Sequence, residues 1–71
     1  MMKAEEVVLI GASGAGAGAV VHGKFGLSTG NAMLDALIGA AIAAVGWYLD
    51  YDGVGDFVEG FGVGYFLDSI L

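Results

Sequence analysis

The sequence predicts an all-α fold: a Gly/Ala-rich antiparallel helical hairpin with an additional C-terminal helical segment, assembling as a homo-oligomer. Three observations support this prediction. Apolar runs are separated by two short polar segments, glycine and alanine supply 25 of the 71 residues, and proline is absent. Because glycine weakens a helix by about 0.8–1 kcal/mol relative to alanine, helices of this composition form only where close backbone packing returns that cost.

The first apolar run predicts a helix over about residues 4–21. It contains nine consecutive small residues, from Gly11 to Ala19. Within them, Gly14 and Gly18 have the i, i+4 spacing of a close contact between helices. The stretch Val-Val-Leu-Ile at residues 7–10, taken alone, is typical of a strand, so this is where the helix prediction is weakest.

A turn is predicted over residues 22–30, followed by the clearest helix, over about residues 31–52. Asn31 or Thr29 can cap its start, and Asp35 falls near the first turn, where the helix dipole favours an acid. Apolar residues recur along it at spacings of three and four, as on the face of a helix. Gly53 then ends or kinks this helix.

A third helical segment is predicted over residues 54–70, so that residues 1–71 form a single domain. Eight small residues along the chain are expected at helix contacts. They are Gly11, Gly14, Gly18, Ala36, Ala40, Ala44, Gly60 and Gly64. Since small residues at spacing four let backbones approach closely, we expect the Gly14/Gly18 and Ala36/Ala40/Ala44 faces to hold copies of the chain together.

Size and composition point to partners. A chain of 71 residues buries little surface and usually needs a disulfide, a metal or other subunits, and here there is no cysteine and a single histidine. Apolar residues make up 58% of the chain, more than one small interior holds, so the excess must face lipid or other copies. Glu5 and Glu6 beside the first apolar run argue against a secretory signal peptide.

The motifs that suggest chemistry are incomplete. Gly14, Gly16 and Ala19 satisfy G-x-G-x-x-A, but no second strand follows as a dinucleotide fold requires. His22 has no nucleophile motif around Ser13, Ser28 or Ser69. The acids between Asp50 and Glu59 lack the register of a calcium-binding EF-hand. We therefore predict no catalytic residue, cofactor or metal, and a protein that is not an enzyme.

Asp35, an acid in an apolar helix, allows a further interpretation. In length, in its Gly-repeat first helix and in the acid on its second helix, the chain resembles the ring subunits of rotary ATPases. That resemblance implies a proton-carrying role for Asp35. The sequence lacks the family's polar loop with Arg and Pro, and Asp35 lies near the turn and not at mid-span, which favours a first-turn acid instead.

Charge is expected to separate along the hairpin. The turn end carries Lys24 and His22 with Asp35 nearby, and seven of the eight acids are expected away from the turn. Such a subunit can place its turns against a polyanion, where amides at a helix N-terminus add phosphate contacts. The residues expected to face DNA are His22, Lys24, Ser28, Thr29 and Asn31. The alternative is the positive-inside loop of a membrane hairpin.

In its length, Gly/Ala content, apolar character and hairpin pattern, the whole chain resembles the small coat proteins of archaeal rod-shaped viruses of the bacilliform, clavavirus-like type. The resemblance implies a major coat protein of the virion, arrayed in many copies as a helical shell that contacts the backbone of double-stranded DNA without reading sequence. The alternative is a small integral-membrane homo-oligomer in a lipid membrane, such as a pilin, a holin-like pore or a ring subunit.

Overall fold

The computed structural model describes residues 3–26, 28–49 and 53–71, and these form three helices. Helix α1 spans Ala4–Gly23, α2 spans Ala32–Leu49 and α3 spans Val54–Ile70. No strand occurs in this described part of the chain, and residues 7–10 lie inside α1. The all-helical prediction is confirmed, while the predicted last residues of the second helix, 50–52, fall outside the described ranges.

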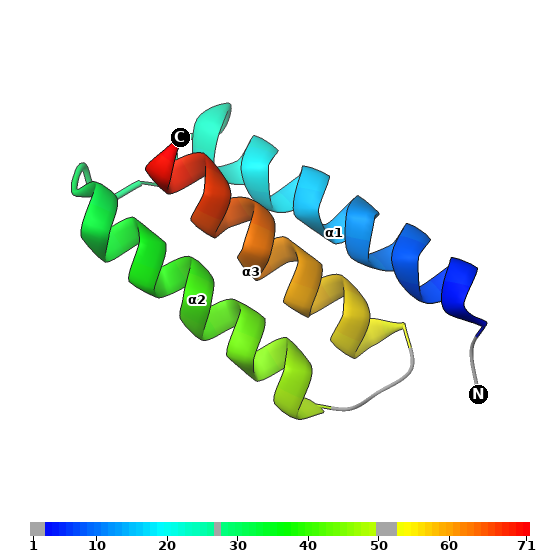
Figure 1. The fold of residues 1–71 in the computed structure, drawn as a ribbon. Coiled ribbons are helices and arrows are strands. Elements are labelled where there is room, and N and C mark those ends of the chain that lie inside the picture. Colours follow the sequence, from blue (N-terminus) through cyan, green and yellow to red (C-terminus); the bar gives the residue numbers. More distant parts are fainter. Residues whose placement is uncertain (1–2, 27, 50–52) are drawn as a thin grey trace.

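The three helices lie side by side in one layer, with α3 in the middle (Figure 1). Helix α1 runs parallel to α3, and α2 runs antiparallel to it (Figure 1). The predicted hairpin between the first two helices is therefore wrong in its contacts, because α1 and α2 each pack against α3 and not against each other. The layer measures 39 × 20 × 16 Å along its principal axes.

Glycine makes the contact between α1 and α3. Gly14 and Gly18 are buried against the backbone of α3 beside Phe57 and Phe61, and a Cβ added at either glycine would collide with that backbone. Small residues thus bring these two helices together as their spacing predicts. The partner face, however, belongs to α3 of the same chain and not to a second copy.

The reciprocal face of α3 is also built from glycine. Gly60 meets the backbone of Gly11, and Gly64 meets that of Ala15. Gly62, two residues from each and thus on the opposite side of the helix, meets α2 at Ala43. Helix α3 occupies the middle because it presents glycine on two opposite faces.

Within the chain, helix α2 packs on α3 through small residues other than Ala40 and Ala44, whose expected contact with other copies stays a prediction. Ala36 is buried, but Ala40 and Ala44 lie on the exposed side of the helix. The contact with α3 is made instead by Gly39 and Gly46, where an added Cβ would collide with backbone. The small-residue stripe that packs follows the i, i+3, i+4 pattern of a helix face, whereas the predicted set kept strictly to spacing four.

Close backbone packing leaves almost no room for a side-chain core. Among the described residues only Ala36 and Tyr65 are buried hydrophobic residues, whereas large apolar side chains such as Leu9, Leu37 and Val45 are exposed. Helices α1 and α2 are long and apolar enough to cross a membrane by length and composition, and little of either is buried within the molecule. The apolar side chains therefore point outward along both flanking helices.

Candidate functional site

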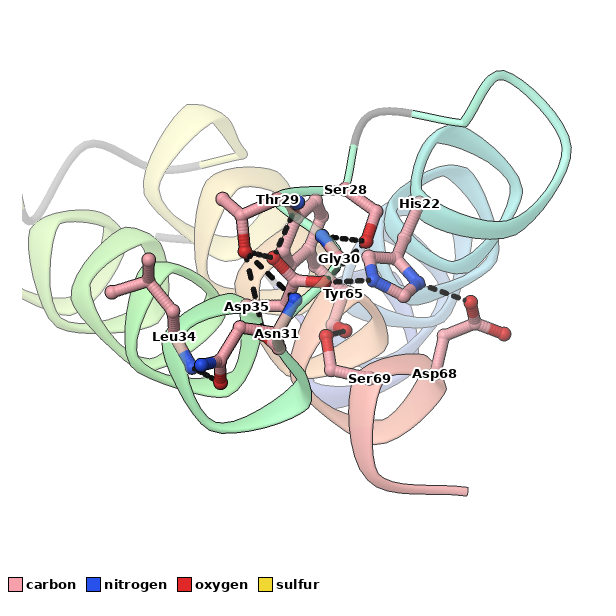
Figure 2. Close-up of polar contacts among 10 residues, drawn as sticks. All are labelled: His22, Ser28, Thr29, Gly30, Asn31, Leu34, Asp35, Tyr65, Asp68 and Ser69. Atoms are coloured by element: carbon pink, nitrogen blue, oxygen red, sulfur yellow. Dashed lines mark hydrogen bonds and ion pairs between the residues drawn. The ribbon is translucent and has the colours of Figure 1, made fainter.

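Polar side chains from all three helices meet at one end of the layer, where α1 ends, α2 begins and α3 ends (Figure 2). We call this group the polar end cluster and define it by its members: His22, Ser28, Thr29, Asp35 and Asp68. The parallel course of α1 and α3 brings their C-terminal ends together, and the antiparallel course of α2 brings its N-terminus to the same place.

Asp35 is the buried centre of the polar end cluster, with 2% of its surface exposed. Its Oδ1 accepts hydrogen bonds from the backbone N–H and the hydroxyl of Thr29, at 2.9 and 2.7 Å. Its Oδ2 accepts from the Ser28 hydroxyl at 2.5 Å and contacts His22 Nε2 at 3.0 Å. Side chains in a helix point back toward its N-terminus, and this directs the carboxylate of Asp35 into the loop that precedes α2.

The loop is shaped to supply those donors. The Asn31 side chain accepts the Leu34 N–H at 3.1 Å and caps α2, as the sequence predicts. Gly30 has φ 83°, a left-handed conformation that glycine adopts without strain. This turn places the hydroxyls of Ser28 and Thr29 over the first turn of α2.

His22 bridges the two acids from the last turn of α1. Its Nε2 faces Asp35, and its Nδ1 lies 2.5 Å from Oδ2 of Asp68 on the last turn of α3 (Figure 2). A carboxylate only accepts hydrogen bonds, and a neutral imidazole has one N–H. With both acids ionised, the geometry requires the doubly protonated imidazolium, which donates from both nitrogens.

The surroundings of His22 are partly closed. Its side chain is 12% exposed, compared with 3% for Asp35 and 37% for Asp68. The buried Tyr65 ring packs edge-on against the imidazole, with ring centroids 4.7 Å apart and an angle of 73°. Exposure thus rises along the chain of contacts from Asp35 through His22 to Asp68.

Four of the five residues expected to face DNA make side-chain contacts within the chain, and the fifth, Lys24, is exposed. His22, Ser28 and Thr29 direct polar atoms toward Asp35, and Asn31 caps α2. Lys24 is exposed at the C-terminal cap of α1, and no ion pair joins it to an acid among the described residues.

The predicted separation of charge needs a correction. Asp68 lies at the turn end beside His22, because α3 returns to that end, so the acids are not confined to the opposite end as expected. Asp50 and Asp52, two of the seven acids expected away from the turn, lie outside the described ranges. With Asp35 and Asp68 both present, the turn end holds two acids beside Lys24 and His22.

Sequence reasoning singled out His22 and Asp35 separately but missed their link. Asp68 was the member of the polar end cluster that the sequence indicated least, since 46 residues separate it from His22. The sequence held one indication of its position. Asp68 follows Gly64 at spacing four and therefore lies on the face of α3 that packs on α1. That register has meaning only once α1 and α3 are known to be parallel neighbours.

The remaining motifs do not assemble into chemical sites in the described part of the chain. Gly14, Gly16 and Ala19 lie within α1 and not in a phosphate-binding turn. Ser13 and Ser69 donate to the helix carbonyls of Leu9 and Tyr65. No group of three or more potential ligands is arranged to hold a metal ion among the described residues.

Comparison of the chain with protein-family models, with curated proteins and with solved structures finds no match in any of the three.

Proposed function

We propose that this protein is a structural subunit of a lipid-embedded homo-oligomer. The observation that supports it best is the placement of apolar side chains on the outside of the molecule. In the most apolar 18-residue stretch of each helix, 11% of the residues of α1 and 22% of those of α2 are buried, and the mean hydropathies are 1.4 and 1.7. Monomeric soluble proteins rarely expose apolar surface on this scale.

Helix lengths agree with a membrane location. Helices of 20 and 18 residues extend about 30 and 27 Å, close to the roughly 30 Å hydrocarbon core of a bilayer. Trp47 and Tyr48 are 76% and 83% exposed at the C-terminal end of α2. Exposed Trp and Tyr at a helix end are typical of the membrane interface.

The acids of α3 fit the same arrangement. Asp56 and Glu59 line a groove of about 290 Å³ between α1 and α3, near the start of α3. Both residues therefore border one groove, toward the end of the layer that bears Glu5 and Glu6. The other acids of the described helices belong to the polar end cluster, so charge is concentrated toward the two ends of the layer.

Self-association is supported by the faces that remain open. Ala40 and Ala44, expected at contacts between copies, lie exposed on α2. Small side chains there let the helix of another copy approach closely. Gly14 and Gly18 of α1 and Gly60, Gly62 and Gly64 of α3 already pack within the chain, whereas this α2 face remains open for contact between copies.

A paired substitution tests the lipid location. Ala41 lies exposed at the middle of α2 and Tyr48 lies exposed near its end. Lysine costs about 2.5–3.5 kcal/mol at the centre of a spanning helix, while near the end it reaches the interface. We expect Ala41→Lys to reduce recovery in membranes that float on a density gradient and resist alkaline extraction, and Tyr48→Lys to be tolerated. Equal recovery of both variants and the natural chain in the soluble fraction would contradict the proposal.

The coat protein inferred from the sequence is a second proposal, supported by the exposed Lys24 at the turn end. In a shell around double-stranded DNA, Lys24 would neutralise phosphates without reading bases. Lys24→Glu is then expected to abolish packaging of nuclease-protected DNA, and Lys3→Glu to be tolerated. Analysis of purified assemblies separates the two proposals: lipid without nucleic acid supports the membrane subunit, and nucleic acid without bilayer lipid supports the coat.

A further inference from the structure

We propose that the polar end cluster is a proton-exchange site in which His22 gains and loses the proton, Asp35 is a fixed anionic partner and Asp68 passes the proton to solvent. The inference does not depend on whether lipid or other copies cover the apolar helices. It rests on the order of contacts through the cluster and on the unequal surroundings of the two carboxylates.

The two acids differ in their freedom to move. Asp35 is held by three donor groups besides His22, from Ser28 and Thr29, and is 3% exposed at its side chain. Among the described residues, the Asp68 carboxylate has His22 as its hydrogen-bond partner, and its side chain is 37% exposed. The Asp68 carboxylate can therefore rotate toward water, whereas the Asp35 carboxylate cannot do so without breaking its hydrogen bonds to Ser28 and Thr29.

This difference decides which ring proton leaves. In the protonated cluster, Nδ1–H donates to Asp68 and Nε2–H donates to Asp35. On release, the Nδ1–H bond breaks, its electron pair stays on Nδ1, and an O–H bond forms on Asp68 Oδ2. That O–H bond then breaks as the proton passes to water. The neutral ring keeps Nε2–H because the immobile Asp35 carboxylate needs that donor.

The groups facing His22 come from every element around it. Helix α2 supplies Asp35, α3 supplies Asp68 and Tyr65, and the loop before α2 supplies hydroxyls that face Asp35. Lys24 is two residues away on the exposed cap and forms no ion pair within the described ranges. Loss of the proton leaves the lone pair of Nδ1 facing the carboxylate of Asp68. Because two acceptors repel each other, the end of α3 then loosens from α1.

Nuclear magnetic resonance of the full chain in detergent micelles, with ¹⁵N-labelled histidine, tests the site. Since His22 is the one histidine in the sequence, every ring signal belongs to it, and only Nδ1 and Nε2 have to be told apart. Spectra are recorded at about pH 5 and about pH 8, on either side of the usual histidine range. We expect the neutral ring of the natural chain to be the Nε2–H tautomer.

Two variants make the expectation specific. In Asp68→Asn the amide can donate to Nδ1, so the neutral ring stays Nε2–H, and the ratio of protonated to neutral ring near pH 7 falls roughly two- to fivefold with loss of a part-exposed ion pair. In Asp35→Asn the amide can donate to Nε2, and the neutral ring becomes Nδ1–H. Asp56→Asn, the same change at the other end of α3, is the matched control and leaves both readouts unchanged.

The outcomes separate exchange from a passive structural role. A neutral Nδ1–H tautomer in the natural chain would overturn the proposal, as would an Asp68→Asn effect no larger than that of Asp56→Asn. Should Asp35→Asn fail to fold, the Asp68→Asn spectra alone decide. Hydrogen exchange adds a second measurement, the exchange rate of amides in the last turn of α3 divided by that of amides in its first turn. This ratio should be higher at about pH 8 than at about pH 5. The difference between the two pH values should be lost in Asp68→Asn.

Discussion

At the middle of the layer, α3 meets its neighbours backbone against backbone through glycine, whereas at its C-terminal end it is joined to α1 by the side-chain contact of Asp68 with His22. Glycine contacts are short and admit no added atom, so they set the distance between helices. The side-chain hydrogen bonds of the polar end cluster have directions, so they set which ends meet. The difference teaches that spacing and register are encoded in separate parts of the chain.

The largest expected effect is at the glycine contacts. Gly18→Leu places a branched side chain where even a Cβ would collide with the backbone of Phe61 and Tyr65. Overpacking of this kind costs about 1–3 kcal/mol or more, so we expect loss of the folded layer and of assembly, with the same outcome for Gly14→Leu. Thermal unfolding in detergent, followed by circular dichroism, measures it.

Gly16 provides the matched control for those substitutions. It lies on the same helix but has nothing within 4 Å of an added Cβ. Gly16→Ala should stabilise the helix by up to about 0.8–1 kcal/mol, because alanine is the better helix former. A Gly16→Leu variant as damaging as Gly18→Leu would mean that α1 has a further contact on that side, as between copies.

The next largest effect is expected at Asp35. Asp35→Ala removes the acceptor for the Ser28 and Thr29 hydroxyls and for His22, and leaves these donors without that acceptor in a partly closed site. We expect a lower melting temperature than for Asp56→Ala, with faster hydrogen exchange at the start of α2. Equal melting temperatures for the two variants would show that the polar end cluster does not stabilise the fold.

A smaller effect is expected at the loop. Thr29→Val keeps the shape of the side chain and the backbone N–H bond to Asp35, but it removes the hydroxyl that donates to Asp35 and accepts the Asn31 N–H. The net contribution of one such hydrogen bond is about 0.5–1.5 kcal/mol. Ser13→Ala is the control, since among the described residues the Ser13 hydroxyl bonds to the carbonyl of Leu9 within its own helix. Paired denaturation curves should rank Thr29→Val below Ser13→Ala in stability.

The helices themselves follow from local sequence. Gly/Ala-rich apolar runs, the Asn31 cap and the glycines at the ends of the runs predicted all three segments, with ends within a few residues where the structure describes them. The small residues Gly11, Gly14, Gly18, Gly60 and Gly64, singled out by their spacing, lie in the contact between α1 and α3 of one chain, and their expected role between copies stays a prediction. Periodicity and capping act within one helix, so a single sequence contains them.

The partners of those faces were decided only by the tertiary structure. A small-residue face is complementary to any other such face, so spacing alone did not reveal that Gly14 and Gly18 meet α3 of the same chain, or that α3 lies between α1 and α2. The same holds for the polar end cluster, where His22 and Asp35 stood out but Asp68 did not. Its contact with His22 exists because two parallel helices end together, and that is a property of the packed layer.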